Sequence, residues 1–164
     1  MIKEGSGGKN TISGLVFEGK SDLFYLIAKQ KNYKVIAKDK NIDYIYYKGS
    51  NIAQIFKKYG FYQFLSFNKI DWKEIISKKL IPDNSLFVFS NNTIYIIEIK
   101  FQQVSGSVDE KLQTCDFKKK QYQKLLKKLN INIEYIYLLS NFFKKPKYKD
   151  VLEYIESVGC KYYF

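Results

Sequence analysis

The feature that most restricts the fold of this chain is a pair of apolar runs joined by a short polar turn. Residues 86–89 and 93–99 consist largely of Phe, Val, Ile and Tyr, and the turn between them contains the pair Asn91-Asn92. Short β-branched and aromatic runs around such a turn are typical of a β-hairpin. Residues 33–37 and 42–47 repeat this pattern around a polar break and predict a second pair of strands. The chain is therefore expected to contain a sheet.

Segments with helical periodicity alternate with these strands. The lysine-rich stretch 107–129 carries leucines at helical spacing and predicts one helix, or two helices broken near residues 114–117. Residues 131–139 predict a buried strand. The further expected elements are helices at 13–30, 51–58, 71–79 and 148–158 and a strand at 160–164. This order predicts an α/β fold, a three-layer sandwich in which helices flank a central mixed sheet.

The length of 164 residues fits one domain. We expect residues 1–164 to form a single domain, with the glycine-rich residues 1–12 as a flexible N-terminal arm. The hydrophobic fraction of 46% is enough for a packed core and excludes a disordered chain. No uncharged apolar run approaches the roughly 18 residues of a membrane span, and the first residues do not resemble a signal peptide. We therefore expect a cytoplasmic protein.

Lysine alone supplies the positive charge, because the sequence contains neither Arg nor His. The 28 lysines exceed the 16 acidic residues and give a net charge of +12. Such an excess favours a polyanionic partner, because lysines that bind phosphates release counterions. An AT-rich genome would produce the same abundance of Lys, Asn, Ile and Tyr, so the charge alone leaves that alternative open.

The lack of histidine excludes several kinds of active site. Ser-His-Asp triads, Cys-His pairs and His-containing zinc sites are all impossible. Cys115 and Cys160 have no CxxC spacing and cannot form a four-thiolate zinc site. Acid–base chemistry in this chain must therefore use carboxylates, Lys or Tyr.

One group of residues around the predicted hairpin carries candidate chemistry. Pro82-Asp83 precedes its first strand, and Glu98-Ile99-Lys100 ends its second. Side chains alternate between the faces of a strand, so Glu98 and Lys100 would point the same way while Ile99 would point into the core. If the hairpin folds back on itself, Asp83 arrives near Glu98. Two carboxylates beside a lysine suit Mg²⁺-dependent hydrolysis of a phosphodiester.

At these residues the sequence resembles the PD-(D/E)xK nuclease superfamily, which includes the type II restriction endonucleases. The resemblance implies that Asp83 and Glu98 bind Mg²⁺, for which Mn²⁺ would substitute, with the Ile99 carbonyl as a further ligand. It implies that Lys100 orients the attacking water. The family often adds an acidic residue from an early helix, and Glu18 is the candidate here.

The resemblance also implies a restriction-endonuclease-like fold with the metal site at one edge of the sheet. The expected activity is site-specific cleavage of double-stranded DNA by a homodimer, with a DNA methyltransferase as a genetic partner. Gln102 continues the alternation after Lys100 and is expected to face the same cleft as a further catalytic candidate. The candidates for DNA contact are Ser105, Ser107, Lys111, Gln113, Lys118, Lys119 and Lys120.

Two alternatives remain open at this point. The same fold would also suit a homing, junction-resolving or repair nuclease. In the other alternative the protein binds DNA or RNA without cutting it, and Glu98 and Lys100 are incidental. Metal dependence separates this second alternative from every nuclease.

Overall fold

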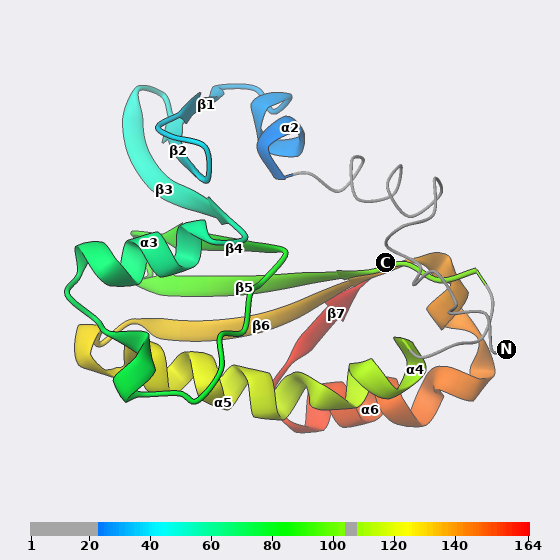
Figure 1. Ribbon diagram of the computed structural model, residues 1–164. Coiled ribbons are helices and arrows are strands. Elements are labelled where there is room, and N and C mark those ends of the chain that lie inside the picture. The colour runs from blue at the N-terminus through cyan, green and yellow to red at the C-terminus, as the bar shows by residue number, and fades with distance from the viewer. Residues whose placement is uncertain (1–22, 104–107) are drawn as a thin grey trace, which may run out of the picture.

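The computed structural model describes residues 23–103 and 108–164 and is an α/β protein with a seven-stranded mixed sheet (Figure 1). The order of the strands in the sheet follows their order in the chain. They are β1 (Tyr33–Ala37), β2 (Ile42–Tyr47), β3 (Ser50–Lys57), β4 (Asn84–Val88), β5 (Thr93–Lys100), β6 (Asn132–Leu139) and β7 (Lys161–Tyr163).

The direction of the strands divides the sheet into two parts. Neighbours from β1 to β5 are antiparallel, whereas β5, β6 and β7 are parallel to one another. Parallel neighbours need a crossover connection, and helices supply it in both places. The connection from β5 to β6 contains α4 (Val108–Lys111), α5 (Cys115–Leu126) and 3₁₀ turns at Leu112–Thr114 and Lys127–Leu129. The connection from β6 to β7 contains 3₁₀ turns at Asn141–Lys144 and Pro146–Tyr148 and then α6 (Lys149–Ser157).

Most of the predicted elements are confirmed. Both strand pairs are present, with β4 and β5 each slightly longer than the sequence indicated. The long helical segment is interrupted at Leu112–Thr114, close to the expected break. The strand expected at 131–139, the helix at 148–158 and the strand at 160–164 all form, with ends that differ by at most one residue. Of the helix expected at 13–30, the structure describes only α2 (Leu23–Ala28), and residues 1–12 lie outside the described residues.

Two predicted helices are wrong. Residues 51–57 belong to β3, which pairs with β2 on one side and β4 on the other. The turn that starts β3 contains Lys48 and Gly49, whose φ angles of 48° and 87° are those of a tight hairpin turn. In residues 71–79 the structure has only a single 3₁₀ turn at Trp72–Glu74. Beyond it, the backbone groups of Leu80 bond to a tyrosine side chain instead of continuing a helix.

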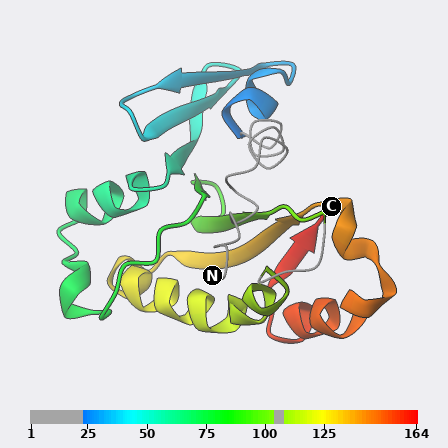
Figure 2. The same ribbon diagram turned by 45° about the vertical axis from the view of Figure 1, so that its right-hand side comes forward.

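One helix was not predicted. α3 (Gly60–Phe67) buries Phe61, Tyr62, Phe64 and Leu65, which recur at the spacing of one helical face. α3, α5 and α6 all contribute to the larger of two hydrophobic cores. The smaller core lies on the other side of the sheet, where α2 packs against the first strands. Figures 1 and 2 both show α5 and α6 along one side of the sheet and α2 beside β1–β3.

The larger core reaches the predicted catalytic motif. Glu98 and Lys100 pair in register with Tyr137 and Leu139, which are core residues of β6. Ile99 is buried as expected, but the side of β5 that carries Glu98 is buried too. The motif therefore lies at the end of a buried face of the sheet. Among the described residues, no helix has the length and apolar character needed to cross a membrane.

Candidate active site

The β4–β5 hairpin brings Asp83 beside Glu98-Ile99-Lys100, as the sequence predicted. Asn84 pairs in register with Ile97, so the residue before it arrives opposite Glu98. The Asp83 carboxylate accepts a hydrogen bond from the Ile99 backbone N–H, with a distance of 2.9 Å between Oδ2 and N. Both strands are interior strands of the sheet. The site therefore lies at the ends of two central strands and not on an outer strand.

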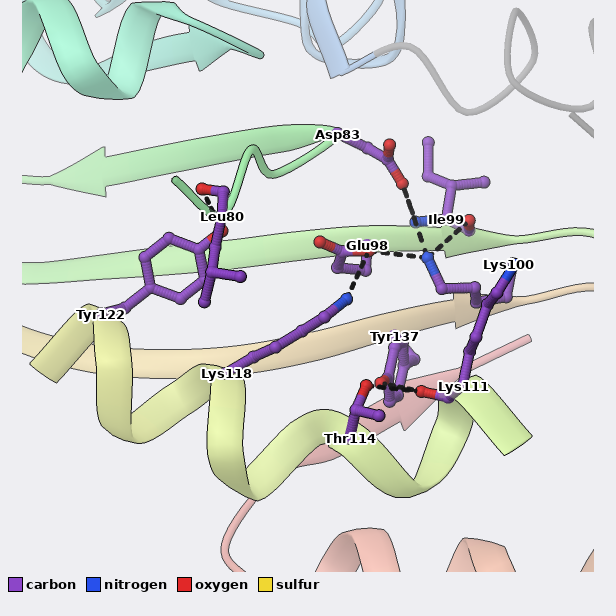
Figure 3. A network of polar contacts seen from close by, with 10 residues as sticks. All are labelled: Leu80, Asp83, Glu98, Ile99, Lys100, Lys111, Thr114, Lys118, Tyr122 and Tyr137. Carbon is purple, nitrogen blue, oxygen red and sulfur yellow. Dashed lines mark hydrogen bonds and ion pairs between the residues drawn. The ribbon is translucent and has the colours of Figure 1, made fainter. Parts of the chain in front are cut away.

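Lys100 joins the two carboxylates (Figure 3). Its Nζ lies 2.6 Å from Glu98 Oε2 and 3.8 Å from Asp83 Oδ2. The same ammonium donates to the Ile99 carbonyl oxygen at 3.4 Å and lies 5.8 Å from the centre of the Tyr137 ring. One cation is thus within ion-pair distance of both predicted metal ligands.

These charged groups are largely removed from water. The side chains of Glu98 and Lys100 are 7% and 9% exposed, and that of Asp83 is 16% exposed. Buried charges are strongly destabilising unless they are paired and hydrogen-bonded. The pairing of the carboxylates with Lys100 therefore explains how the strand end tolerates them.

Buried tyrosines line the Glu98 side of the site. Burial raises the pKa of Tyr122, Tyr135 and Tyr137, and the negative charge of Glu98 raises each pKa further. All three hydroxyls are therefore protonated at neutral pH. They surround Glu98 with neutral groups, which leaves lysines as its counterions.

Lys118 is the second lysine at Glu98, and sequence reasoning assigned it to DNA contact instead. Its Nζ reaches across from α5 to within 3.5 Å of Glu98 Oε2, and its side chain is 23% exposed. Burial lowers its pKa, and the nearby Lys100 charge lowers it further, while Glu98 acts in the opposite direction. A signal was available, because Lys118 shares a helical face with the buried Tyr122 and Leu125.

The other two lysines of the run point elsewhere. Lys119 donates to the backbone oxygen of Gly159 at 2.6 Å and so ties α5 to the start of the last strand. Lys120 pairs with Asp116 at 2.7 Å and remains 64% exposed. It contributes to a surface groove along α5 and the start of β6. The structure therefore does not bring Lys118, Lys119 and Lys120 onto one face.

The remaining sequence candidates are divided between the strand end and other surfaces. Gln102 is buried directly after β5, and its backbone exchanges hydrogen bonds with the Ser140 hydroxyl, which fastens the ends of β5 and β6 together. Lys111 is exposed, and Figure 3 shows its side chain extending from α4 toward the strand end. Gln113 lines a groove with α6 residues and not with the carboxylates. Glu18, Ser105 and Ser107 lie outside the described residues.

The donors at the strand end fit a hard divalent cation. Within residues 23–103 and 108–164, no group of three or more His, Cys, Asp and Glu side chains is arranged to hold a metal ion. Mg²⁺ needs less, because it commonly uses one or two carboxylates and keeps several waters. Asp83 and Glu98 already share one cation, the Lys100 ammonium, and the Ile99 carbonyl oxygen lies beside them. This set is consistent with Mg²⁺ or Mn²⁺ binding.

The charges of the cluster also indicate the kind of substrate that would follow a metal. Two carboxylates and two ammonium groups balance each other. A bound divalent cation would leave the site positively charged, which favours an anion such as a phosphodiester.

Comparisons with family models, with curated proteins and with solved structures found no match for this chain.

Proposed function

We propose that this protein is a Mg²⁺-dependent endonuclease that cuts double-stranded DNA at a specific site, as type II restriction endonucleases do. The observation that carries the proposal is the meeting of Asp83, Glu98 and Lys100 at one end of the β4–β5 hairpin. Their spacing in the sequence resembles the PD-(D/E)xK motif. The net charge of +12 adds support, because DNA is a polyanion.

In this proposal Asp83, Glu98 and the Ile99 carbonyl hold the metal ion. The bound ion would supply charge neutralisation at the phosphate and would make its bound water more acidic. Lys100 lies against both carboxylates, so it orients the attacking water beside them. The Ile99 N–H keeps the Asp83 carboxylate turned toward the strand end.

Lys118 has a separate role in the proposed site. It approaches Glu98 from α5, on the far side of the cluster from Asp83 (Figure 3). With a metal ion held at Glu98, the Lys118 ammonium would be available to contact a phosphate oxygen. We therefore assign it to binding the scissile phosphate, and its partial burial strengthens that contact because water screens it less.

We propose further that the seven-stranded mixed sheet is a variant of the restriction-endonuclease-like three-layer sandwich. The hairpin that carries Asp83 and Glu98, followed by a helical crossover to a parallel strand, supports this reading. Cleavage of both DNA strands would follow from a homodimer in which each subunit cuts one strand.

The test is incubation of the purified protein with phage-sized duplex DNA in Mg²⁺ or in EDTA. The variants are Asp83→Ala and Lys100→Ala, with Lys149→Ala as a control because Lys149 pairs with Glu153 on the exposed surface. We expect discrete bands that require Mg²⁺, persist in the control and disappear in both site variants. A smear with the same dependence would retain the active site but replace site specificity with a nonspecific or structure-selective nuclease. DNA binding without cleavage, unchanged in both variants, would overturn the proposal.

A further inference from the structure

Three hydrogen bonds with two tyrosine hydroxyls hold Leu80, three residues before Asp83. The Tyr62 hydroxyl donates to the Leu80 carbonyl oxygen at 3.0 Å and accepts from the Leu80 N–H at 2.9 Å. The Tyr122 hydroxyl donates to the same carbonyl at 2.9 Å. Tyr62 comes from α3 and Tyr122 from α5, so two helices hold one residue of the connection between α3 and β4. Figure 3 shows the contact between Tyr122 and Leu80.

The two tyrosines are themselves fixed by packing. Tyr122 is fully buried, and Tyr62 is 5% exposed. Both rings pack edge-to-face against Phe61, at centroid distances of 5.3 Å and 5.5 Å. The Lys79 ammonium, directly before Leu80, lies 4.9 Å from the centre of the Tyr62 ring. The hydroxyls are therefore held at fixed positions relative to the core.

The segment between Leu80 and Asp83 is too short and stiff to absorb a displacement. Only Ile81 and Pro82 separate them, and the proline ring fixes its own φ angle and restricts the residue before it. At the other end, Asp83 meets the Ile99 N–H and Lys100. A shift of Leu80 would therefore move the Asp83 carboxylate relative to the end of β5.

We propose that Tyr62 and Tyr122 are positioning residues, which hold the segment 80–83 so that the Asp83 carboxylate faces the end of β5. The consequence for metal binding rests on the proposed nuclease function, whereas the positioning itself does not. Burial raises the pKa of both hydroxyls, so they remain donors over the whole working pH range. Sequence patterns do not reveal this arrangement, because both tyrosines read as ordinary core residues.

The first test needs neither metal nor DNA. Tyr62→Phe and Tyr122→Phe each remove one hydroxyl and keep the ring. Tyr148→Phe is the matched control, because Tyr148 is a buried tyrosine of the connection from β6 to β7. Hydrogen exchange of the Ile99 amide, followed by NMR, reports whether Asp83 still accepts from it. Asp83→Ala removes that acceptor and sets the upper limit of the effect.

We expect exchange at Ile99 to become about fivefold faster in Tyr62→Phe and in Tyr122→Phe, which corresponds to one ordinary hydrogen bond. It should not change in Tyr148→Phe. The amides of β6 serve as a reference for global stability. Exchange at Ile99 that stays at the wild-type rate, or that rises only as much as exchange in β6, would overturn the proposal.

The second test links positioning to the metal. Mn²⁺ binding in the presence of a DNA duplex, measured by electron paramagnetic resonance, should weaken about fivefold in both tyrosine variants. Cleavage at saturating metal should return to near the wild-type rate, which a general folding defect would not allow. If the wild-type protein neither binds Mn²⁺ nor cuts DNA, the nuclease proposal fails, and the exchange experiment still decides the positioning role.

Discussion

Because Glu98 and Lys100 form a buried ion pair, we expect that removing the charge of Glu98 lowers the stability of the protein. The variant Glu98→Gln keeps the size of the side chain and removes only its charge. In the native protein Glu98 Oε2 lies 2.6 Å from Lys100 Nζ and 3.5 Å from Lys118 Nζ. The variant leaves these two ammonium groups with Asp83, 3.8 Å from Lys100, as the nearby carboxylate.

The burial of the pair sets the size of the effect. Removing one partner of a buried ion pair typically destabilises a protein by about 3–5 kcal/mol, because the remaining charge is left without a counterion. We expect the lower end, a loss of about 3 kcal/mol, because Lys118 is partly exposed and Asp83 remains. Urea denaturation measures this change in the free energy of unfolding. The melting temperature should fall by roughly 6–12 °C for a chain of this length.

A double variant separates the ion pair from a general packing defect. Glu98→Gln combined with Lys100→Met removes both members of the pair, and we expect it to recover most of the lost stability. Glu153→Gln is the control, because its pair with Lys149 is 63% and 74% exposed and should contribute almost nothing. A Glu98→Gln protein as stable as the wild type, or a double variant that regains no stability, would show that the buried ion pair does not determine the effect.

Three further predictions concern Lys118, Gly60 and Gly49. Burial lowers the pKa of Lys118 below the ordinary lysine value of 10.5, so cleavage should decrease as the pH rises through that lowered pKa. When the cleavage rate is measured against pH, the decrease should occur at a higher pH in Lys118→Arg. Lys118→Gln should cut more slowly and should not show the decrease. Identical pH profiles in the wild type and both variants would contradict the role of Lys118. Gly60→Ala should destabilise the protein by about 1–3 kcal/mol although alanine favours helices, because the new Cβ would meet the backbone oxygen of Asn41. A Gly60→Ala protein that is more stable than the wild type would contradict this packing. The Cβ in Gly49→Ala would meet no neighbour, but residue 49 has a φ of 87°, so urea denaturation should show a loss of about 1 kcal/mol in the free energy of unfolding.

The local part of the fold could be predicted from the sequence. The β4–β5 hairpin follows from two apolar runs around an Asn-Asn turn, and Asn92 has a positive φ of 49°. Once that hairpin is given, strand alternation and register bring Asp83 to Glu98 and Lys100. These features depend on neighbours in sequence or on one tight turn, so the pattern of residues was sufficient.

The predictions that were wrong concern residues whose structure depends on partners far away in the sequence. β3 is a short apolar segment that reads equally well as a helix, and its pairing with β4 decided the outcome. Lys118 lies in a run of three lysines, and although its spacing from Tyr122 indicates the buried face of α5, the packing of α5 on the sheet brings it to Glu98. Likewise, no helix continues over residues 75–79, and Leu80 after them donates to the Tyr62 hydroxyl and accepts from the Tyr122 hydroxyl, 18 and 42 positions away.

The most direct test of the account is the rate of duplex DNA cleavage under single-turnover conditions as a function of Mg²⁺. The wild-type protein is compared with Asp83→Asn, in which only the carboxylate charge is lost, and with Glu153→Gln. If the protein is a Mg²⁺-dependent nuclease, cleavage should depend on Mg²⁺ and be unchanged in Glu153→Gln. In Asp83→Asn it should be slower by on the order of 100-fold or more. Cleavage that continues in EDTA, or that proceeds at the wild-type rate in Asp83→Asn, would contradict it.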